Sequence, residues 1–417
     1  MNARQHVLSW WAAGWIALLA VWQFFRGGWA GSGCWSRGVS GDLPSLCVDP
    51  YWINQWLKNY AGGFSKRGLM GEILRHLFPG GLDLLGLNLA ALVLLVAIAL
   101  LLALLVHRLL RSSLLSAAVI TSLLLLSPFG KSLAETALDP LQLCVLLVAA
   151  VLLTPPESSA RDAVVIAAYG LASLIYEGSV LLLLPVGFWL MRPGLWRWSP
   201  LAMAAGLLLI FQHQDPAGLG EAARRALVAT NPYTGQQLRY QDGAGLAASV
   251  SFAFNVKQEF SRYLTDSVRD TVSRMSRSLG VVLVYGLALL TAMGRANSQG
   301  RRELVLIWLS WIPFALPFVL ITHDWLRYGV ILLLLAMLVA VAKRQSAGPL
   351  LVVHPWWGFS IPEASASAVL MFCVVIGPAT EDVRKFLPHD YFHVSLLMIV
   401  VASVVFWWNQ IRLARLC

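Results

Sequence analysis

Apolar residues in this chain occur in runs of roughly 15–25 residues separated by short polar breaks, a pattern typical of membrane-spanning helices. About twelve such segments can be counted: 7–25, 82–106, 113–128, 141–154, 163–176, 178–191, 200–212, 279–294, 303–321, 327–343, 365–377 and 393–410. Several are shorter than the ~20 residues of a full span, so we expect roughly 10–13 transmembrane helices. The pattern predicts an all-α, polytopic integral membrane protein with a single transmembrane domain over residues 1–417.

Basic residues predict the orientation of these segments. They follow the second, sixth, eighth, tenth and twelfth segments: Arg108, Arg111, Arg192, Arg197, Arg295, Arg301, Arg302, Lys343, Arg344, Arg412 and Arg415. All are even-numbered ends, so the positive-inside rule places them, and both termini, in the cytoplasm. The outer side then receives the odd-numbered ends: 26–81, 131–140, 176–178, 213–278, 322–326 and 377–392.

Two of these outer segments are long. The first outer (periplasmic) loop, 26–81, holds Cys34 and Cys47, which could form a disulfide in an oxidising compartment. The second, 213–278, ends in an apolar pattern with steps of three or four residues. This pattern predicts an amphipathic helix on the outer membrane surface. Its apolar positions are Phe260, Leu264, Val268, Val272, Met275 and Leu279.

Composition agrees with a membrane protein and argues against other classes. The 417 residues are 58% hydrophobic and 12% charged, whereas a soluble domain averages about 25% charged. The net charge of +10 does not indicate nucleic-acid binding, because the basic residues lie beside apolar runs. The run Val7 to Phe25 holds four Trp and no small-residue cleavage site, so we expect a membrane helix and not a cleaved signal. No Cys/His spacing predicts a metal site.

The stretch Asp49-Pro50-Tyr51-Trp52 is the first that could carry chemistry. The carboxylate of Asp49 could accept a proton from a substrate hydroxyl. Alternatively, Asp49 caps a helix that begins near Pro50, since an acid followed by proline is a helix-start signature.

The stretch Gly62-Gly63-Phe64-Ser65-Lys66-Arg67-Gly68 combines glycines, which allow close backbone approach, with two cations. Arginine suits bidentate phosphate recognition, so Lys66 and Arg67 could bind the phosphate of a lipid-linked donor. They could instead be anchors at the level of the lipid headgroups. Glu72 follows between apolar neighbours, where an acid is costly unless paired; Arg75, three residues on, offers a local partner.

Three further acids lie in predicted outer breaks. Glu135 and Asp139 are four residues apart, a spacing that puts both carboxylates on one face of a helix. They could hold a divalent cation (Mg or Mn) or bind a sugar, or Asp139 could cap the next helix at Pro140. Glu177 interrupts a long apolar stretch and is a functional candidate, or it marks a tight turn with Gly178.

The stretch His323-Asp324-Trp325-Leu326-Arg327-Tyr328 packs a base, an acid, an indole and a guanidinium between two apolar segments. Asp324 and Arg327 could form a local pair. Four such groups at a membrane boundary are more than a turn requires, which favours a functional role.

These stretches resemble the GT-C class of membrane glycosyltransferases and uncharacterised bacterial membrane proteins with the same layout. The matching features are an acid in the first outer loop, here Asp49, and stretches similar to the patterns G-G-F-x-[KR]-R-G and H-D-W-x-R-[WY]. GT-C enzymes often carry paired acids in that loop. This chain departs from them, because the nearest acid to Asp49 is Asp42, seven residues before it.

The resemblance implies inverting transfer of a sugar from a polyprenyl-phosphate donor to a glycan or lipid acceptor, on the periplasmic face of a bacterial inner membrane. Asp49 would orient or deprotonate the acceptor hydroxyl. Lys66, Arg67 and Arg327 would bind the donor phosphate as charge develops on it. His323 and Asp324 would bind sugar or assist proton transfer. Glu72, Glu135, Asp139 and Glu177 are the further substrate-binding candidates.

Three other functions remain open. A lipid-linked polysaccharide polymerase or ligase would use the same ingredients. A secondary transporter fits the helix count and the cytoplasmic termini, but the polar residues cluster at outer helix ends, and no matched pair of broken segments occurs in the two halves. A non-catalytic membrane scaffold would not need the His, Asp and Arg residues at the outer boundary.

Overall fold

The computed structural model describes residues 3–27, 52, 55–56, 60, 68–79, 84–110, 114–126, 128–212, 285–286, 289–290, 298–314 and 325–344. All regular structure in these ranges is helical, and they contain no strand, which agrees with the predicted all-α class. In chain order the elements are α1 (Ala3–Gly27), α4 (Gly68–Leu77), α5 (Leu84–Leu110), α6 (Leu114–Leu126), α7 (Pro128–Glu135), α8 (Pro140–Ala149), η1 (Ala150–Leu153), α9 (Ser159–Ile175), α10 (Ser179–Leu182), α11 (Leu184–Leu190), η2 (Leu195–Trp198), α12 (Ser199–Gln212), α17 (Ser298–Ser310) and α19 (Trp325–Lys343).

The first seven predicted apolar segments, and the ninth and tenth, each coincide with a helix or a pair of helices. The sixth segment is a pair, because the chain leaves α10 at Leu183 and Pro185 opens α11. Among the described elements, α4, α7 and the short 3₁₀ helix η2 were not predicted, and α4 and α7 are short and mixed in polarity. The predicted segments 365–377 and 393–410 and the predicted amphipathic helix after Phe260 lie outside the described residues.

Two helices in the described part of the chain are long and apolar enough to cross a membrane: Val7–Phe25 within α1 and Gly86–Leu110 within α5. Three shorter apolar stretches accompany them: Ala117–Leu126, Pro140–Leu153 and Ser179–Leu190. A count of about twelve transmembrane helices therefore stays a prediction.

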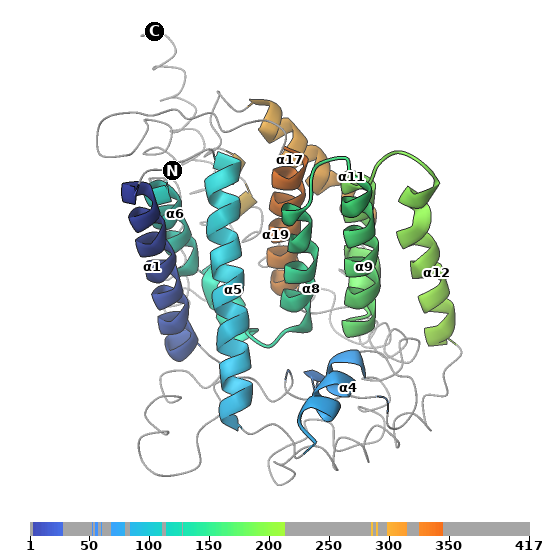
Figure 1. The fold of residues 1–417 in the computed structure, drawn as a ribbon, viewed down its shortest axis with the longest axis horizontal. Coiled ribbons are helices and arrows are strands. Elements are labelled where there is room, and N and C mark those ends of the chain that lie inside the picture. Colours follow the sequence, from blue (N-terminus) through green and yellow to red (C-terminus); the bar gives the residue numbers. More distant parts are fainter. Residues whose placement is uncertain are drawn as a thin grey trace, which may run out of the picture.

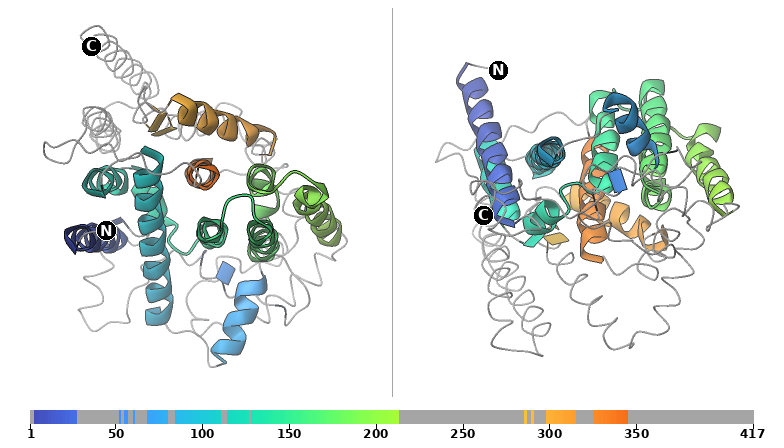
Figure 2. Two further views of the ribbon diagram at one scale, coloured as in Figure 1. Left: turned by 45° about the horizontal axis from the view of Figure 1, so that its top comes forward. Right: turned by 90° about the horizontal axis from the view of Figure 1, so that it is seen from below.

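The helix α19 forms the centre of the packing. It contacts α5, α7, α8, α11 and α17, and Figure 2 (left) shows it end-on among the other helices. Every residue from Val330 to Ala342 except Leu332 is buried. A helix that is apolar on all sides belongs in such an interior position, and the run Gly329–Ala342 contains no charged residue.

The helix α1 lies at the edge of the bundle and packs against α5, α6 and α7. Its outward side exposes large apolar side chains, with Trp10 78% and Trp11 75% exposed. On its inward side Trp15 donates a hydrogen bond to Ser122 and Gln23 donates one to the carbonyl of Leu125. An outward face of this kind suits contact with lipid chains.

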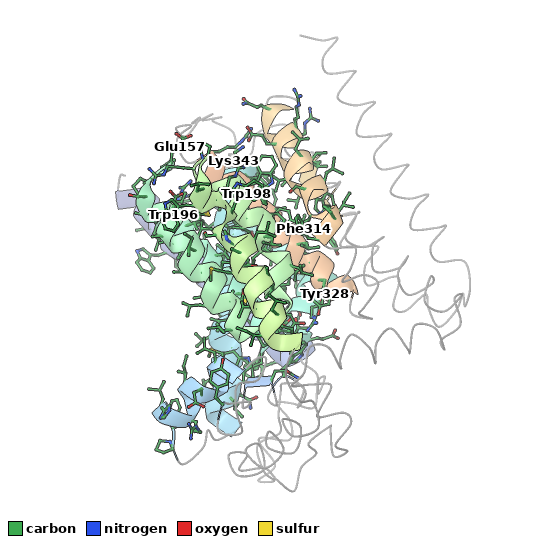
Figure 3. The ribbon with its side chains drawn as sticks, turned by 90° about the vertical axis from the view of Figure 1, so that its right-hand side faces the viewer. Glu157, Trp196, Trp198, Phe314, Tyr328 and Lys343 are labelled. Carbon is green, nitrogen blue, oxygen red and sulfur yellow. The ribbon has the colours of Figure 1, made fainter. Side chains whose placement is uncertain are left out.

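Opposite ends of the bundle carry different residues. At the basic end, Arg192 pairs with Asp162, Arg344 pairs with Glu303, and Lys343 lies over the ring of Trp189. These contacts bring together the ends of α11 and α19 and the starts of α9 and α17, as the positive-inside argument predicts for even-numbered ends (Figure 1). The other end, here called the motif end, holds Asp139, Tyr176, Glu177, Arg327 and Tyr328. Tyr328 lies away from Glu157 and Lys343 in Figure 3.

Candidate functional site at the motif end

The site begins with Asp139, the residue that starts α8. Its side chain accepts the backbone N–H of Leu141 at 3.0 Å, and Pro140 occupies the first helical position. This confirms the capping role that the sequence offered as one alternative, since Asp followed by Pro satisfies the free amides of a helix start. Asp139 is fully buried, so its remaining carboxylate oxygen faces the interior of the protein.

Arg327 supplies the countercharge. It stands in the first turn of α19, and its Nη1 lies 3.4 Å from Oδ2 of Asp139, with both side chains buried. A buried charge is costly unless a partner and hydrogen bonds offset its lost hydration. The partner of Arg327 thus comes from the start of α8. Asp324, the local partner that the sequence offered, lies outside the described residues.

Aromatic side chains enclose the guanidinium of Arg327. Its Nη2 donates to the hydroxyl oxygens of Tyr328 at 2.7 Å and Tyr176 at 3.3 Å, and these two hydroxyls lie 2.5 Å apart. The guanidinium carbon lies 4.7 Å from the ring centre of Trp52 and 4.5 Å from that of Tyr328. Arginine suits such a site because its planar cation both stacks on rings and donates hydrogen bonds.

The contact between Trp52 and Arg327 joins two of the stretches that the sequence singled out. Trp52 is the last residue of Asp49-Pro-Tyr-Trp, and Arg327 is the fifth of His323-Asp-Trp-Leu-Arg-Tyr. A second link holds the first stretch in place, since Nε1 of Trp56 donates to the carbonyl of Leu138 at 2.6 Å. Residues far apart in the sequence therefore meet beside the start of α8.

Glu177 lies in the turn between α9 and α10, and its side chain is 5% exposed. The backbone N–H groups of Ser179 and Val180 donate to the carbonyls of Tyr176 and Glu177, which closes a tight turn. The turn that the sequence offered as an alternative is therefore present. Because Glu177 is a buried ionisable residue, it stays a functional candidate. It lies at a helix end and not in the middle of a helix.

A second group of polar residues surrounds Glu72 on α4. Glu72 accepts hydrogen bonds from the guanidinium of Arg75 and from the backbone N–H of Tyr60, and Nε2 of His76 lies 3.0 Å away. The bond from Arg75, helped by that from Tyr60, lowers the pKa of the Glu72 carboxyl below its ordinary value of 4.5. Burial, together with the charge of Glu72, raises the pKa of Tyr60 to about 12. The local Glu72–Arg75 pair is thus confirmed.

Tyr60 also packs against the start of α4. Gly68, the first residue of α4, packs against the Tyr60 ring so tightly that an added Cβ would overlap the ring carbon Cε1. Tyr60 and Gly68, eight residues apart in the sequence, are therefore in direct contact. The glycine at position 68 is required by this close approach and not by its backbone angles.

The single helical face predicted for Glu135 and Asp139 is wrong. The helix α7 ends at Glu135, and the chain turns before α8 begins. Glu135 is exposed whereas Asp139 is fully buried, so the two carboxylates do not share a face. Among the described residues, no three His, Cys, Asp or Glu side chains gather in a way that could hold a metal ion.

Sequence reasoning missed three aromatic residues of the site as partners of Arg327. These are Trp52, Tyr176 and Tyr328. A signal existed, because a buried arginine requires partners and all three lie beside residues already singled out. Of the other predicted site residues, Asp49, Lys66, Arg67, His323 and Asp324 lie outside the described residues, as do Cys34 and Cys47.

Comparison with known proteins adds a partial match. Residues 42–188 match a family model described as "Uncharacterised membrane protein Rv1490". The chain is similar to a family of uncharacterised membrane proteins. The matched part includes Asp49, Trp52, Asp139 and Tyr176, whereas Arg327 lies beyond it. Together with the two membrane-length apolar helices, the match supports a helical membrane protein.

Two further comparisons found no relatives. No curated protein matches the chain. No solved structure matches it either.

Proposed function

We propose that this protein is a membrane glycosyltransferase of GT-C type, which moves a sugar from a polyprenyl-phosphate donor to a glycan or lipid acceptor at the motif end of its helix bundle. The reaction takes place on the non-cytoplasmic face, because the positive-inside rule assigns the basic end to the cytoplasm. The contact between Trp52 and Arg327 is the observation that carries this proposal.

This contact matters because of the residues beside it. Asp49 precedes Trp52 by three residues, and Asp324 precedes Arg327 by three. Both acids therefore lie close in sequence to a residue of this contact, and on that ground we assign them to one site. An acceptor hydroxyl held there can lose its proton to a carboxylate as the new glycosidic bond forms.

The basic residues have two different roles in this proposal. Lys66 and Arg67, which precede α4 in the sequence, bind the donor phosphate and stabilise the negative charge that develops on it as the bond to the sugar breaks. Arg327 is already enclosed by Asp139 and three aromatic rings. It supports the site by holding Trp52, and Asp139 is a positioning residue for Arg327 and not a sugar ligand.

Transport is less well supported by the same geometry. A transporter places its ionisable residues near the middle of the membrane, on interrupted helices. Glu177, Asp139 and Arg327 instead lie at helix ends: in the α9–α10 turn, at the cap of α8 and in the first turn of α19. A polymerase or ligase would place the same groups at the same end, and it differs only in its acceptor.

A reconstituted assay tests the proposal. The full chain in lipid vesicles is supplied with a panel of polyprenyl-phosphate sugars and a membrane extract as the source of acceptor, and transfer of radiolabelled sugar is measured. We expect transfer from at least one donor. We also expect Asp49→Asn to lower kcat by about a hundredfold or more, the range typical of a catalytic base.

Two variants make the result specific. Arg67→Ala should raise KM for the donor, because it removes a phosphate contact. Glu157→Gln is the matched control: Glu157 is exposed in the loop before α9, at the basic end of the bundle (Figure 3), so this variant should transfer at the wild-type rate. Equal rates for wild type and Asp49→Asn would overturn the proposed role of Asp49.

A further inference from the structure

The helix α4 differs from the other helices of the bundle in position and in pattern. It lies at the motif end, below the row of roughly parallel helices in Figure 1, and it packs against α9. Its apolar residues Leu69, Met70, Ile73, Leu74 and Leu77 recur at steps of one, three and four. This spacing gathers them on one side of the helix and leaves the polar residues of its other side together.

The protein uses only part of that apolar side. Leu69, Met70 and Leu74 pack against the core. Ile73 is 42% exposed and Leu77 is 65% exposed, one turn apart on the same side, and Phe78 directly after the helix is 45% exposed. These three large side chains make a contiguous apolar edge, which we call the α4 edge. Burying such side chains is worth about 1.5–3 kcal/mol each, so an occupant is expected.

The position of α4 along the chain indicates what that occupant is. Residues 78–85 are all that separates the end of α4 from Gly86, where the membrane-length apolar stretch of α5 begins. The lower end of α5 and α4 lie at the same end of the bundle (Figure 1). A helix so close to the start of a membrane span is at the level where lipid headgroups meet the acyl chains.

The polar side of α4 suits the same location. Arg75 and His76 lie two and one positions before Leu77 and hydrogen-bond Glu72, so these polar groups are paired with one another and stay near water. His76 is exposed. A helix with an apolar edge and a paired, exposed polar side fits a membrane surface better than it fits a wholly aqueous or a wholly protein environment.

We propose that α4 binds the surface of the lipid bilayer, with Ile73, Leu77 and Phe78 inserted among the lipid chains and Arg75 and His76 in the headgroup layer. The helix thereby holds Tyr60, which donates its backbone N–H to Glu72 and packs its ring against Gly68, at the membrane surface. This attachment of α4 does not rest on the proposed function.

Spin labels test the attachment directly. The full chain, with its native cysteines replaced by serine or alanine, carries Leu77→Cys or His76→Cys and is reconstituted in phospholipid vesicles. Collision rates are measured with oxygen, which concentrates in lipid, and with a water-soluble nickel complex. For the label at position 77 we expect a several-fold higher ratio of oxygen to nickel collisions than for the label at 76.

Two results would overturn the attachment. One is equal access of the nickel complex to both labels, which places the α4 edge in water. The other is protection of position 77 from both reagents, which means that a second copy or another segment of the protein covers it. Neither result bears on sugar transfer, so failure of this inference is distinguishable from failure of the proposed function.

A second measurement leaves the native cysteines in place. Phe78 is replaced by p-benzoylphenylalanine, a photoreactive phenylalanine that carries a benzoyl group on its ring, and the protein is irradiated in its membrane. Mass spectrometry of the peptide that contains residue 78 should find lipid adducts. Adducts to protein peptides without lipid adducts would contradict the proposal.

Discussion

The guanidinium group of Arg327 lies over the indole ring of Trp52, with 4.7 Å between the guanidinium carbon and the ring centre. This relationship joins two of the stretches that the sequence singled out as candidates for chemistry, and the proposed function depends on it. The desolvated cation–π contact is worth about 2 kcal/mol. Trp52→Leu should remove that amount from the free energy of unfolding, beyond the loss from its smaller buried area, and Trp52→Phe should lose less because it keeps a ring.

A double-mutant cycle isolates this contact. In an Arg327→Met background the guanidinium is gone, so the difference between Trp52→Leu and Trp52→Phe should shrink by the cation–π contribution. Unfolding is followed by denaturant titration in detergent micelles. A difference that does not change between the two backgrounds would mean that Trp52 contributes only through its size.

Asp139 has two roles, capping α8 and pairing with Arg327, and two substitutions separate them. Asparagine caps a helix about as well as aspartate, so Asp139→Asn should lose only the ion pair. Removing one partner of a buried ion pair lowers the free energy of unfolding by about 3–5 kcal/mol. Asp139→Ala also removes the cap, so its free energy of unfolding should be about 1 kcal/mol lower than that of Asp139→Asn.

Removal of both charges gives the matched control for that experiment. Asp139→Asn combined with Arg327→Met leaves no buried charge without its countercharge, so the double variant should be more stable than Asp139→Asn alone. Thermal unfolding of the wild type, the single variants Asp139→Asn and Arg327→Met, and the double variant measures this difference in stability. If Arg327→Met lowered the stability of Asp139→Asn further, Arg327 would be stabilised mainly by contacts other than that with Asp139.

Gly68 should not tolerate even one added methyl group. The Cβ of Gly68→Ala would overlap the Tyr60 ring, so we expect overpacking to lower the free energy of unfolding of the variant by about 1–3 kcal/mol. In a Tyr60→Ala background, where the ring is absent, Gly68→Ala should cause little of this loss in the free energy of unfolding. Gly206→Ala in α12 is the control: nothing lies within 4 Å of its Cβ, so the variant should be stabilised by up to about 1 kcal/mol.

The stability of α4 should depend on pH through Glu72. The bond from Arg75 lowers the pKa of Glu72 in the folded protein below 4.5, so the unfolded chain binds this proton more readily. The contribution of Glu72 is therefore present above its unfolded pKa and is lost as pH falls through the lower, folded value. Amide hydrogen exchange of α4, corrected for intrinsic rates, should show weaker protection in acid, and Glu72→Gln should remove that dependence. An unchanged pH dependence in Glu72→Gln would assign it to another group.

The fold was largely predictable because hydropathy reports helices directly. Nine of the predicted apolar segments coincide with helices or helix pairs, since a run such as Leu84–Leu110 has no other stable arrangement in lipid. The helix α4 was missed because its ten residues mix apolar and charged side chains. The order of packing around α19 was missed as well, because uniform hydropathy shows that a helix is buried but not which neighbours cover it.

The site was predictable residue by residue but not in its pairings. Local rules found the Asp139 cap, the Glu72–Arg75 pair and the turn at Glu177. They could not find the pair of Asp139 and Arg327, because only the tertiary fold brings the start of α8 to the start of α19. The shared helical face of Glu135 and Asp139 was inferred from spacing alone, and the turn after Glu135 removes it.

The central claim is that the stretches joined by Trp52 and Arg327 form one site for sugar transfer. The most direct test compares cell-envelope glycans and polyprenyl-phosphate sugars, by mass spectrometry, in the native organism. Four strains are needed: wild type, a deletion strain, and that strain complemented with Asp49→Asn or with Glu157→Gln. We predict that the deletion and Asp49→Asn strains lack one sugar from a glycan and accumulate its polyprenyl-phosphate donor, while Glu157→Gln restores both. Identical glycans and donor pools in all four strains would contradict the account.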